Sequence, residues 1–229
     1  NNHKNLKSIK MEIFRNNELI GYNYYFFKKD KDIVQITNRV KFKVKLLGAT
    51  IFNVEGYGEE RYEKNQLISF KSKTKQNNKE KFVNLEFDKE KKVFVINGSS
   101  YTGTAEINNV IGSWWNYKIL ETEGQISPIS GSVKKQIINF ISEENIKLYG
   151  KNFKTKHYKI ISKNQDLPDD KKLNFDIWLD KKTGLILKVQ YSKMGNWEYR
   201  LKSFNWNYFY FPATTIPSIN IVGELVEYL

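Results

Sequence analysis

A chain of 229 residues, 40% of them hydrophobic and 15% aromatic, can bury a core and is too apolar to be intrinsically disordered. It has no cysteine, which excludes disulfides and thiolate metal sites, and no run of about 18 apolar residues that would cross a bilayer as a helix. The net charge of +13 is carried almost wholly by lysine and is spread along the chain. Because a nucleic-acid site concentrates its charge and favours arginine, we expect a solvated lysine surface and no nucleic-acid partner. Weak peripheral contact with an anionic membrane is compatible with this charge.

The first part of the chain alternates apolar and polar residues, and Val40–Leu46 (Val-Lys-Phe-Lys-Val-Lys-Leu) is the clearest case. Side chains of a β-strand point alternately to two faces, so the pattern predicts strands with one apolar and one hydrated face. A turn is expected at Asn16-Asn17, after the first strand. A tight hairpin turn is expected at Asn97-Gly98, where both positions suit positive φ. The expected strands cover residues 9–13, 21–28, 33–47, 51–62, 67–74, 79–87 and 93–96.

The alternation breaks over residues 107–120, which suit a short helix or a covering loop and contain Trp114 and Trp115. Pro128 and Gly131 then mark a linker. Residues 133–148 fit either a helix or two short strands, and we favour the strands. Further strands are expected at residues 155–162, 175–179, 185–191 and 197–202.

The C-terminal segment differs in kind from the rest of the chain. Phe204–Phe211 is unusually aromatic, and Pro212 and Pro217 follow in a stretch without lysine. The segment could form an extra strand, a plug over the apolar face, a partner-binding segment or a poorly ordered end. We therefore divide the chain into one β domain, residues 1–202, and an aromatic tail, residues 203–229.

These segments add up to about ten to twelve strands in antiparallel meander order with little helix, which is an all-β fold. A twisted sheet of that size does not stay flat with one apolar face open to water, so we expect a half-barrel or barrel. Such a barrel can leave an interior that holds an apolar ligand.

A series of short motifs runs along residues 9–202 in a recognisable order. It comprises Asn16–Gly21, Phe42–Phe52, Glu60–Leu67, Ser113–Asn116, Lys156–Tyr158 and Ile177–Asp180. The series resembles a bacterial domain-of-unknown-function family of exported proteins, itself similar in shape to the lipoprotein-localisation-factor (LolA/LolB-like) half-barrels. Two positions depart from that family, which usually has glycine at Asn17 and tyrosine at Leu179.

The resemblance implies a periplasmic or secreted bacterial protein whose signal peptide has been removed. The missing initial methionine agrees with this, and so would a trimmed chain. It also implies a concave face with a lipid or another amphiphile against it. It implies no catalytic residues, and it does not extend to the tail.

Candidate chemical groups are few. His3 and His157 are the only histidines and have no metal-ligand spacing, so we predict no metal and no cofactor. We read His157 as a hydrogen-bonded, half-buried sheet residue. A set of four carboxylates could act with His157 in an enzyme, but a solvated salt-bridge ladder with lysines is favoured. That set is Glu55, Glu59, Glu60 and Glu63. With no nucleophile elbow or phosphate loop, we predict no catalytic residue and no enzyme.

The indoles of Trp114 and Trp115 could lid a cavity or stack on a sugar, and plugging the end of a barrel is the favoured interpretation. The sequence therefore predicts a monomeric, non-catalytic binding or carrier module for a lipid-like or other apolar ligand. The alternative is a structural or envelope-interaction protein that docks a partner through its aromatic tail. The expected ligand wall consists of Trp114, Trp115, Trp178, Phe42, Val44, Phe52, Val54 and His157.

Overall fold

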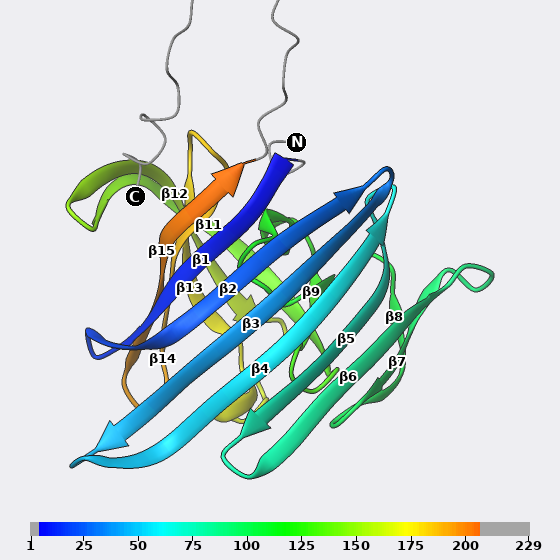
Figure 1. The fold of residues 1–229 in the computed structure, drawn as a ribbon, viewed down its shortest axis with the longest axis horizontal. Helices are drawn as coiled ribbons and strands as arrows, with labels where there is room; N and C mark the ends of the chain where they lie inside the picture. Colours follow the sequence, from blue (N-terminus) through cyan, green and yellow to red (C-terminus); the bar gives the residue numbers. More distant parts are fainter. Residues whose placement is uncertain (1–4, 207–229) are drawn as a thin grey trace, which may run out of the picture.

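The computed structural model describes residues 5–206. They form one large sheet of fifteen strands, in the spatial order β8-β7-β6-β5-β4-β3-β2-β1-β15-β14-β13-β12-β11-β10-β9 (Figure 1). Every neighbouring pair is antiparallel except β9 with β10. The all-β prediction is confirmed, and the meander order holds with more strands than expected.

The strands form two arms that we name by chain order. The N-terminal arm contains β1 (Leu6–Arg15), β2 (Glu18–Asp30), β3 (Ile33–Leu46), β4 (Ala49–Glu63), β5 (Gln66–Gln76), β6 (Lys79–Asp88), β7 (Val93–Gly98) and β8 (Thr102–Glu106). The C-terminal arm contains β9 (Val110–Ile111), β10 (Gly124–Ile126), β11 (Val133–Leu148), β12 (Lys151–Ser162), β13 (Asn174–Asp180), β14 (Ile186–Ser192) and β15 (Asn196–Trp206). Two short 3₁₀ helices are η2 (Tyr117–Leu120) and η3 (Asp169–Lys171).

The curvature of the sheet follows from its connectivity. β8 and β9 are the two edges of the sheet and are not paired with each other, yet only residues 107–109 lie between them in the chain. Because an extended residue spans at most about 3.6 Å, these edges must lie close together. The sheet therefore curls into an open, barrel-like shape, which Figure 1 shows. Pairing of β1 with β15, for example Met11 opposite Leu201, joins the two arms.

The predicted turns are confirmed in part. Asn16 and Asn17 both have positive φ (49° and 67°) at the β1–β2 hairpin, as a two-residue turn requires. The turn expected at Asn97-Gly98 is wrong, because both residues belong to β7 and Asn97 pairs with Thr102. A Cβ added to Gly98 would lie 2.5 Å from the Ser130 carbonyl oxygen, so glycine is needed there for close approach of another segment.

Two boundaries also differ from expectation. Residues 133–148 form a single strand, β11, with an irregularity between Phe140 and Ser142 that lets the long β11–β12 hairpin bend. The last strand continues to Trp206, four residues beyond the expected end at position 202. Residues 203–206, which we assigned to the tail, therefore belong to β15. The rest of the tail, residues 207–229, lies outside the described residues, and so does the plug or docking segment expected there.

Candidate functional site

The inside of the curled sheet is filled by the segment that follows β8. Trp115 packs edge-on against Phe27 and Tyr62 of the N-terminal arm, with ring centroids 5.5 and 5.9 Å apart. Trp114 packs against Phe175 and Tyr199 of the C-terminal arm, at 5.2 and 6.1 Å. The two indoles thus bridge the arms from within, which is the plugging role that the sequence favours.

A carboxyl group lies buried beside this plug. Glu60 on β4 is only 3% exposed; its Oε1 accepts a hydrogen bond from Trp115 Nε1 at 2.8 Å and its Oε2 accepts one from the Tyr62 hydroxyl at 2.6 Å. Burial raises the pKa of the Glu60 carboxyl to about 7, because desolvation outweighs the two hydrogen bonds that favour the charged form. The sequence placed Glu60 in a solvated ladder, and for this residue the prediction is wrong. Glu55 and Glu63, by contrast, do form ion pairs with Lys41 and Lys89 at 3.5 and 3.8 Å.

A second polar contact fixes the other indole. The Tyr25 hydroxyl accepts a hydrogen bond from the Trp114 backbone N–H at 3.1 Å and another from Asn23 Nδ2 at 2.9 Å. Burial raises the pKa of Tyr25 well above its usual range, so the hydroxyl stays neutral. The polar atoms inside the sheet are therefore used to hold the plug in place.

The expected wall formed by β3 and β4 is a packed cluster. Phe42 packs against Phe52 and Trp197 with centroids 6.0 and 5.4 Å apart. Val44 and Val54 are 4% and 3% exposed. Trp197 of the C-terminal arm is buried in this cluster.

His157 and Trp178 lie on the opposite face of the sheet from the plug. Ile177 is fully buried in the cluster that Trp114 contacts, and because side chains alternate along a strand, its neighbour Trp178 faces outward. The His157 ring stacks on Trp178 with centroids 4.4 Å apart. The eight residues expected to form one ligand wall therefore lie in three separate places, and the structure does not bring them together.

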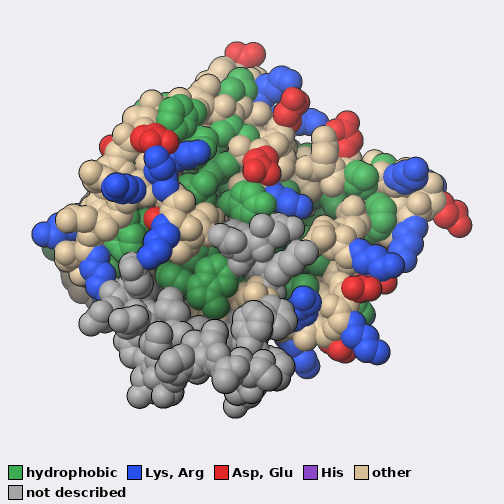
Figure 2. Space-filling view, turned by 90° about the horizontal axis from the view of Figure 1, so that it is seen from above, with side chains coloured by type: hydrophobic (Ala, Val, Ile, Leu, Met, Phe, Trp, Pro, Cys, Tyr) green, Lys and Arg blue, Asp and Glu red, His purple; other side chains and the backbone are tan. Residues whose placement is uncertain are grey.

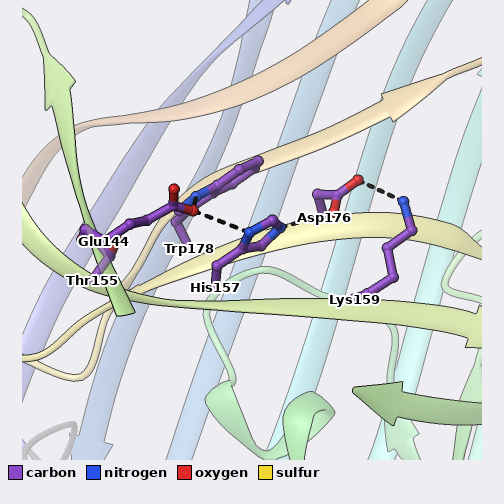
Figure 3. A network of polar contacts seen from close by, with 6 residues as sticks. All are labelled: Glu144, Thr155, His157, Lys159, Asp176 and Trp178. Atoms are coloured by element: carbon purple, nitrogen blue, oxygen red, sulfur yellow. Dashed lines mark hydrogen bonds and ion pairs between the residues drawn. The ribbon is translucent and has the colours of Figure 1, made fainter. Parts of the chain in front are cut away.

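His157 is the centre of a polar network on β11, β12 and β13 (Figure 3). Its Nδ1 lies 3.0 Å from Glu144 Oε1, and its Nε2 lies 2.8 Å from Asp176 Oδ1. Trp178 Nε1 donates to Glu144 Oε1 at 2.6 Å, and Lys159 Nζ contacts Asp176 Oδ2 at 2.6 Å. Only the imidazolium form can donate to both carboxylates at once. This arrangement confirms a hydrogen-bonded sheet histidine.

The enzyme hypothesis required His157 to converge with the carboxylates around Glu59. Glu59 is on β4 in the N-terminal arm, where it pairs with Thr37 and Lys71, whereas the carboxylates at His157 belong to Glu144 and Asp176. The proposed catalytic grouping is therefore absent from residues 5–206. No cluster of three metal-ligating side chains occurs in that same range either.

An apolar pocket lies elsewhere, at the end of the sheet where β15 ends and the β11–β12 hairpin bends over. It has a volume of about 510 Å³. Leu148, Leu187 and Leu201 are buried in its wall, at 7%, 2% and 6% exposure. Figure 2, which looks onto this end, shows hydrophobic side chains with Lys and Arg side chains beside them. The remaining lining residues are Tyr149, Lys151, Asn152, Phe153, Lys154, Asp180, Lys181, Lys182, Thr183, Phe204 and Trp206. We call this site the end pocket.

A second depression, of about 620 Å³, crosses β2 to β6 and has a different character. Its lining mixes charged residues of both signs with three aromatic rings, and Lys41 is paired there with Glu55 at 3.5 Å. The end pocket is therefore the one with a largely apolar wall. The charged and aromatic lining of the second depression comprises Arg39, Lys41, Lys73, Lys75, Lys81, Glu55, Glu80, Tyr22, Tyr57 and Phe82.

A family model described as a domain of unknown function, DUF6134, matches residues 11–202. The chain belongs to this family. The match covers β2 to β14 whole, the second half of β1 and most of β15, so the DUF6134 domain corresponds to the curled sheet. A comparison with curated proteins gives no match.

The DUF6134 fold is similar to a solved structure, the beta-barrel-like protein of domain of unknown function DUF1849 from Brucella abortus. The TM-score is 0.57 at 9% sequence identity, over 87% of this chain and 95% of the other. At that identity the likeness concerns the fold alone. Within the described DUF6134 residues, no helix has the length and apolar character needed to cross a membrane.

Sequence analysis missed the end pocket and the buried position of Glu60. The alternation of side chains along a strand puts Glu60 on the face opposite Glu55, Glu59 and Glu63, but it does not say which of the two faces is buried. No local signal marks the pocket, because its walls come from β11, β12, β14, β15 and the turn after β13.

Proposed function

We propose that this DUF6134 protein is a non-catalytic binding module for an apolar or amphiphilic ligand, held in the end pocket. The observation that supports it is the pocket of about 510 Å³ with a largely aliphatic and aromatic wall. Ligand sites typically enclose about 300–1,000 Å³ and are lined mainly by apolar side chains. The proposed function is the ligand binding expected from the sequence, but the proposed site is the end pocket and not the expected wall on β3 and β4.

The position of the proposed ligand site follows from the packing of side chains inside the curled sheet. Trp114, Trp115 and Trp197 pack against other aromatic rings inside the sheet, whereas the apolar pocket of about 510 Å³ lies at its end. At the end pocket, Leu187 and Leu201 come from paired strands and so form a firm floor, while Phe153 belongs to the bent hairpin. A firm floor with a wall on a projecting hairpin suits a site that admits an elongated apolar chain.

A LolA/LolB-like half-barrel relationship and a periplasmic location belong to the same proposal. The motif series along residues 9–202 and the curled antiparallel sheet support it. Carriers of this kind shield an apolar ligand from water, which is the role that an apolar pocket in an otherwise lysine-rich surface would serve.

The test uses Trp206, which is the tryptophan in the wall of the end pocket. A long-chain alcohol carrying bromine on its chain should quench Trp206 fluorescence on binding to the full chain. In a Trp206→Phe variant, the quenching should be reduced, because Trp206 is the tryptophan among the lining residues of this pocket.

A matched pair of variants locates the site. Phe153→Asp places a charge in the apolar wall and should weaken binding of the alcohol at least about tenfold, whereas Phe140→Asp should not. Phe140 is a suitable control because it is on the same hairpin, 56% exposed and outside the pocket. Equal binding by Phe153→Asp and the wild type, with both folded by circular dichroism, would contradict the proposal.

A further inference from the structure

We infer that the ligand of the end pocket is an anionic amphiphile, with its apolar chain against the leucine floor and its charged head among lysines. This inference rests on the proposed function and specifies its substrate class. It is based on the charged side chains that line the pocket, most of which are positive.

Four lysines and one aspartate are the charged residues of the lining: Lys151, Lys154, Lys181, Lys182 and Asp180. Lys151 and Lys154 are on β12, and the other two lysines begin the turn after β13. The lining of one pocket therefore offers both cationic groups and apolar side chains, which are the two features that bind an amphiphile.

The single carboxylate of the lining does not neutralise this charge. Asp180 is 6% exposed, and its Oδ2 accepts hydrogen bonds from the Thr183 backbone N–H at 2.9 Å and from the Thr183 hydroxyl at 2.6 Å. It is thus held in its own turn. Lys181 contacts Glu143 of β11 at 2.5 Å, so that ammonium group is already paired. Lys151 and Lys154 of β12 are therefore the cations that we assign to the head group.

The chemistry of the lysine side chain determines which head groups the pocket can distinguish. An ammonium group is a compact charge without the fork geometry of a guanidinium, so it attracts a carboxylate and a phosphate alike. Lysine also lays its methylene stem along apolar surface while its charge stays in water. The recognised features are therefore one negative head group and one apolar chain, and a cationic or neutral head of the same length is disfavoured.

The experiment compares three amphiphiles of identical chain length on the full-length protein: a fatty-acid anion, the corresponding alcohol and the corresponding alkyl trimethylammonium. Affinity should fall in that order, and the preference for the anion over the alcohol should shrink as salt is added. A phosphate-headed analogue should bind as the fatty acid does.

Variants assign the preference to the lysines of this pocket. A Lys151→Met, Lys154→Met double variant should weaken the anion about fivefold and leave the alcohol unchanged. A Lys43→Met, Lys45→Met variant is the control, because it removes the same net charge from exposed positions on β3 outside the pocket.

The outcomes separate the two proposals. If none of the amphiphiles binds, both the proposed function and this inference fail. If the alcohol binds as tightly as the anion, or if the control variant weakens the anion as much as the pocket variant, only the inference about the head group is overturned.

Discussion

Two regions of this protein use the same pair of side chains, a tryptophan N–H donating to a glutamate, in opposite surroundings. Inside the sheet, Trp115 donates to Glu60, which is 3% exposed and has no salt bridge among residues 5–206. On the outer face, Trp178 donates to Glu144, whose side chain is 40% exposed and lies beside His157.

The two pairs differ in burial, and burial is what shifts the pKa of the inner carboxyl group. Burial raises the pKa of Glu60 to about 7, so near neutral pH its protonation changes within the core. Glu144 is 40% exposed and its Oε1 lies 3.0 Å from His157 Nδ1. The inner pair therefore couples folding to pH, whereas the outer pair belongs to an ordinary network of charged groups.

The largest expected effect is on the pH dependence of stability. Because the pKa of Glu60 is higher in the folded protein than in the unfolded chain, the folded state binds more protons between about pH 4.5 and pH 7. As the pH rises through that range, the free energy of unfolding should fall by up to about 3 kcal/mol. Chemical denaturation at a series of pH values measures it.

A Glu60→Gln variant should lose this pH-dependent part of the free energy of unfolding. The stability of the variant relative to the wild type should therefore be greater above pH 7 than at pH 5. Glu55→Gln is the matched control, because Glu55 is exposed on the opposite face of the same strand. An identical pH profile for Glu60→Gln and the wild type would show that the carboxyl group does not titrate in the core.

The second prediction removes the indole N–H from each pair and keeps an aromatic ring. Trp115→Phe leaves a buried carboxyl with one donor fewer and should lower the free energy of unfolding by about 2 kcal/mol. Trp178→Phe should cost less than about 1 kcal/mol, because water can replace the lost donor at Glu144. Equal losses in the two variants would mean that burial does not distinguish the regions.

The third prediction concerns His157, which links two strands through Glu144 and Asp176. A His157→Phe variant keeps the stacking on Trp178 and loses both polar contacts, so it should destabilise by about 1 kcal/mol. Thermal unfolding measures the loss.

The smallest expected effect on stability concerns the ion pair between Lys159 and Asp176, beside His157. Lys159→Met removes the cation that contacts Asp176 at 2.6 Å, and this partly exposed pair should contribute less than about 1 kcal/mol. Lys71→Met is a control with a 4.0 Å, well-exposed pair to Glu86, for which we expect no measurable change. A larger loss at Lys159 than at His157 would reverse the order of importance within the network.

The sequence by itself determined the class of fold and most strand positions, because an alternating pattern such as Val40–Leu46 depends only on the period of a β-strand. It also determined turns such as Asn16-Asn17, where the local backbone needs residues that accept positive φ. It could not decide between helix and strand for residues 133–148, whose partner strand supplies the answer.

Only the tertiary structure decided which alternating face is inside. Ile177 and Trp178 are both apolar, and curling of the sheet buries the first among core residues and turns the second toward His157. Glu60 is buried because Trp115, distant in sequence, folds over it. The end pocket likewise exists only where β11, β12, β14 and β15 meet. A local pattern fixes the two faces of each strand, but long-range pairing and packing choose what each face meets.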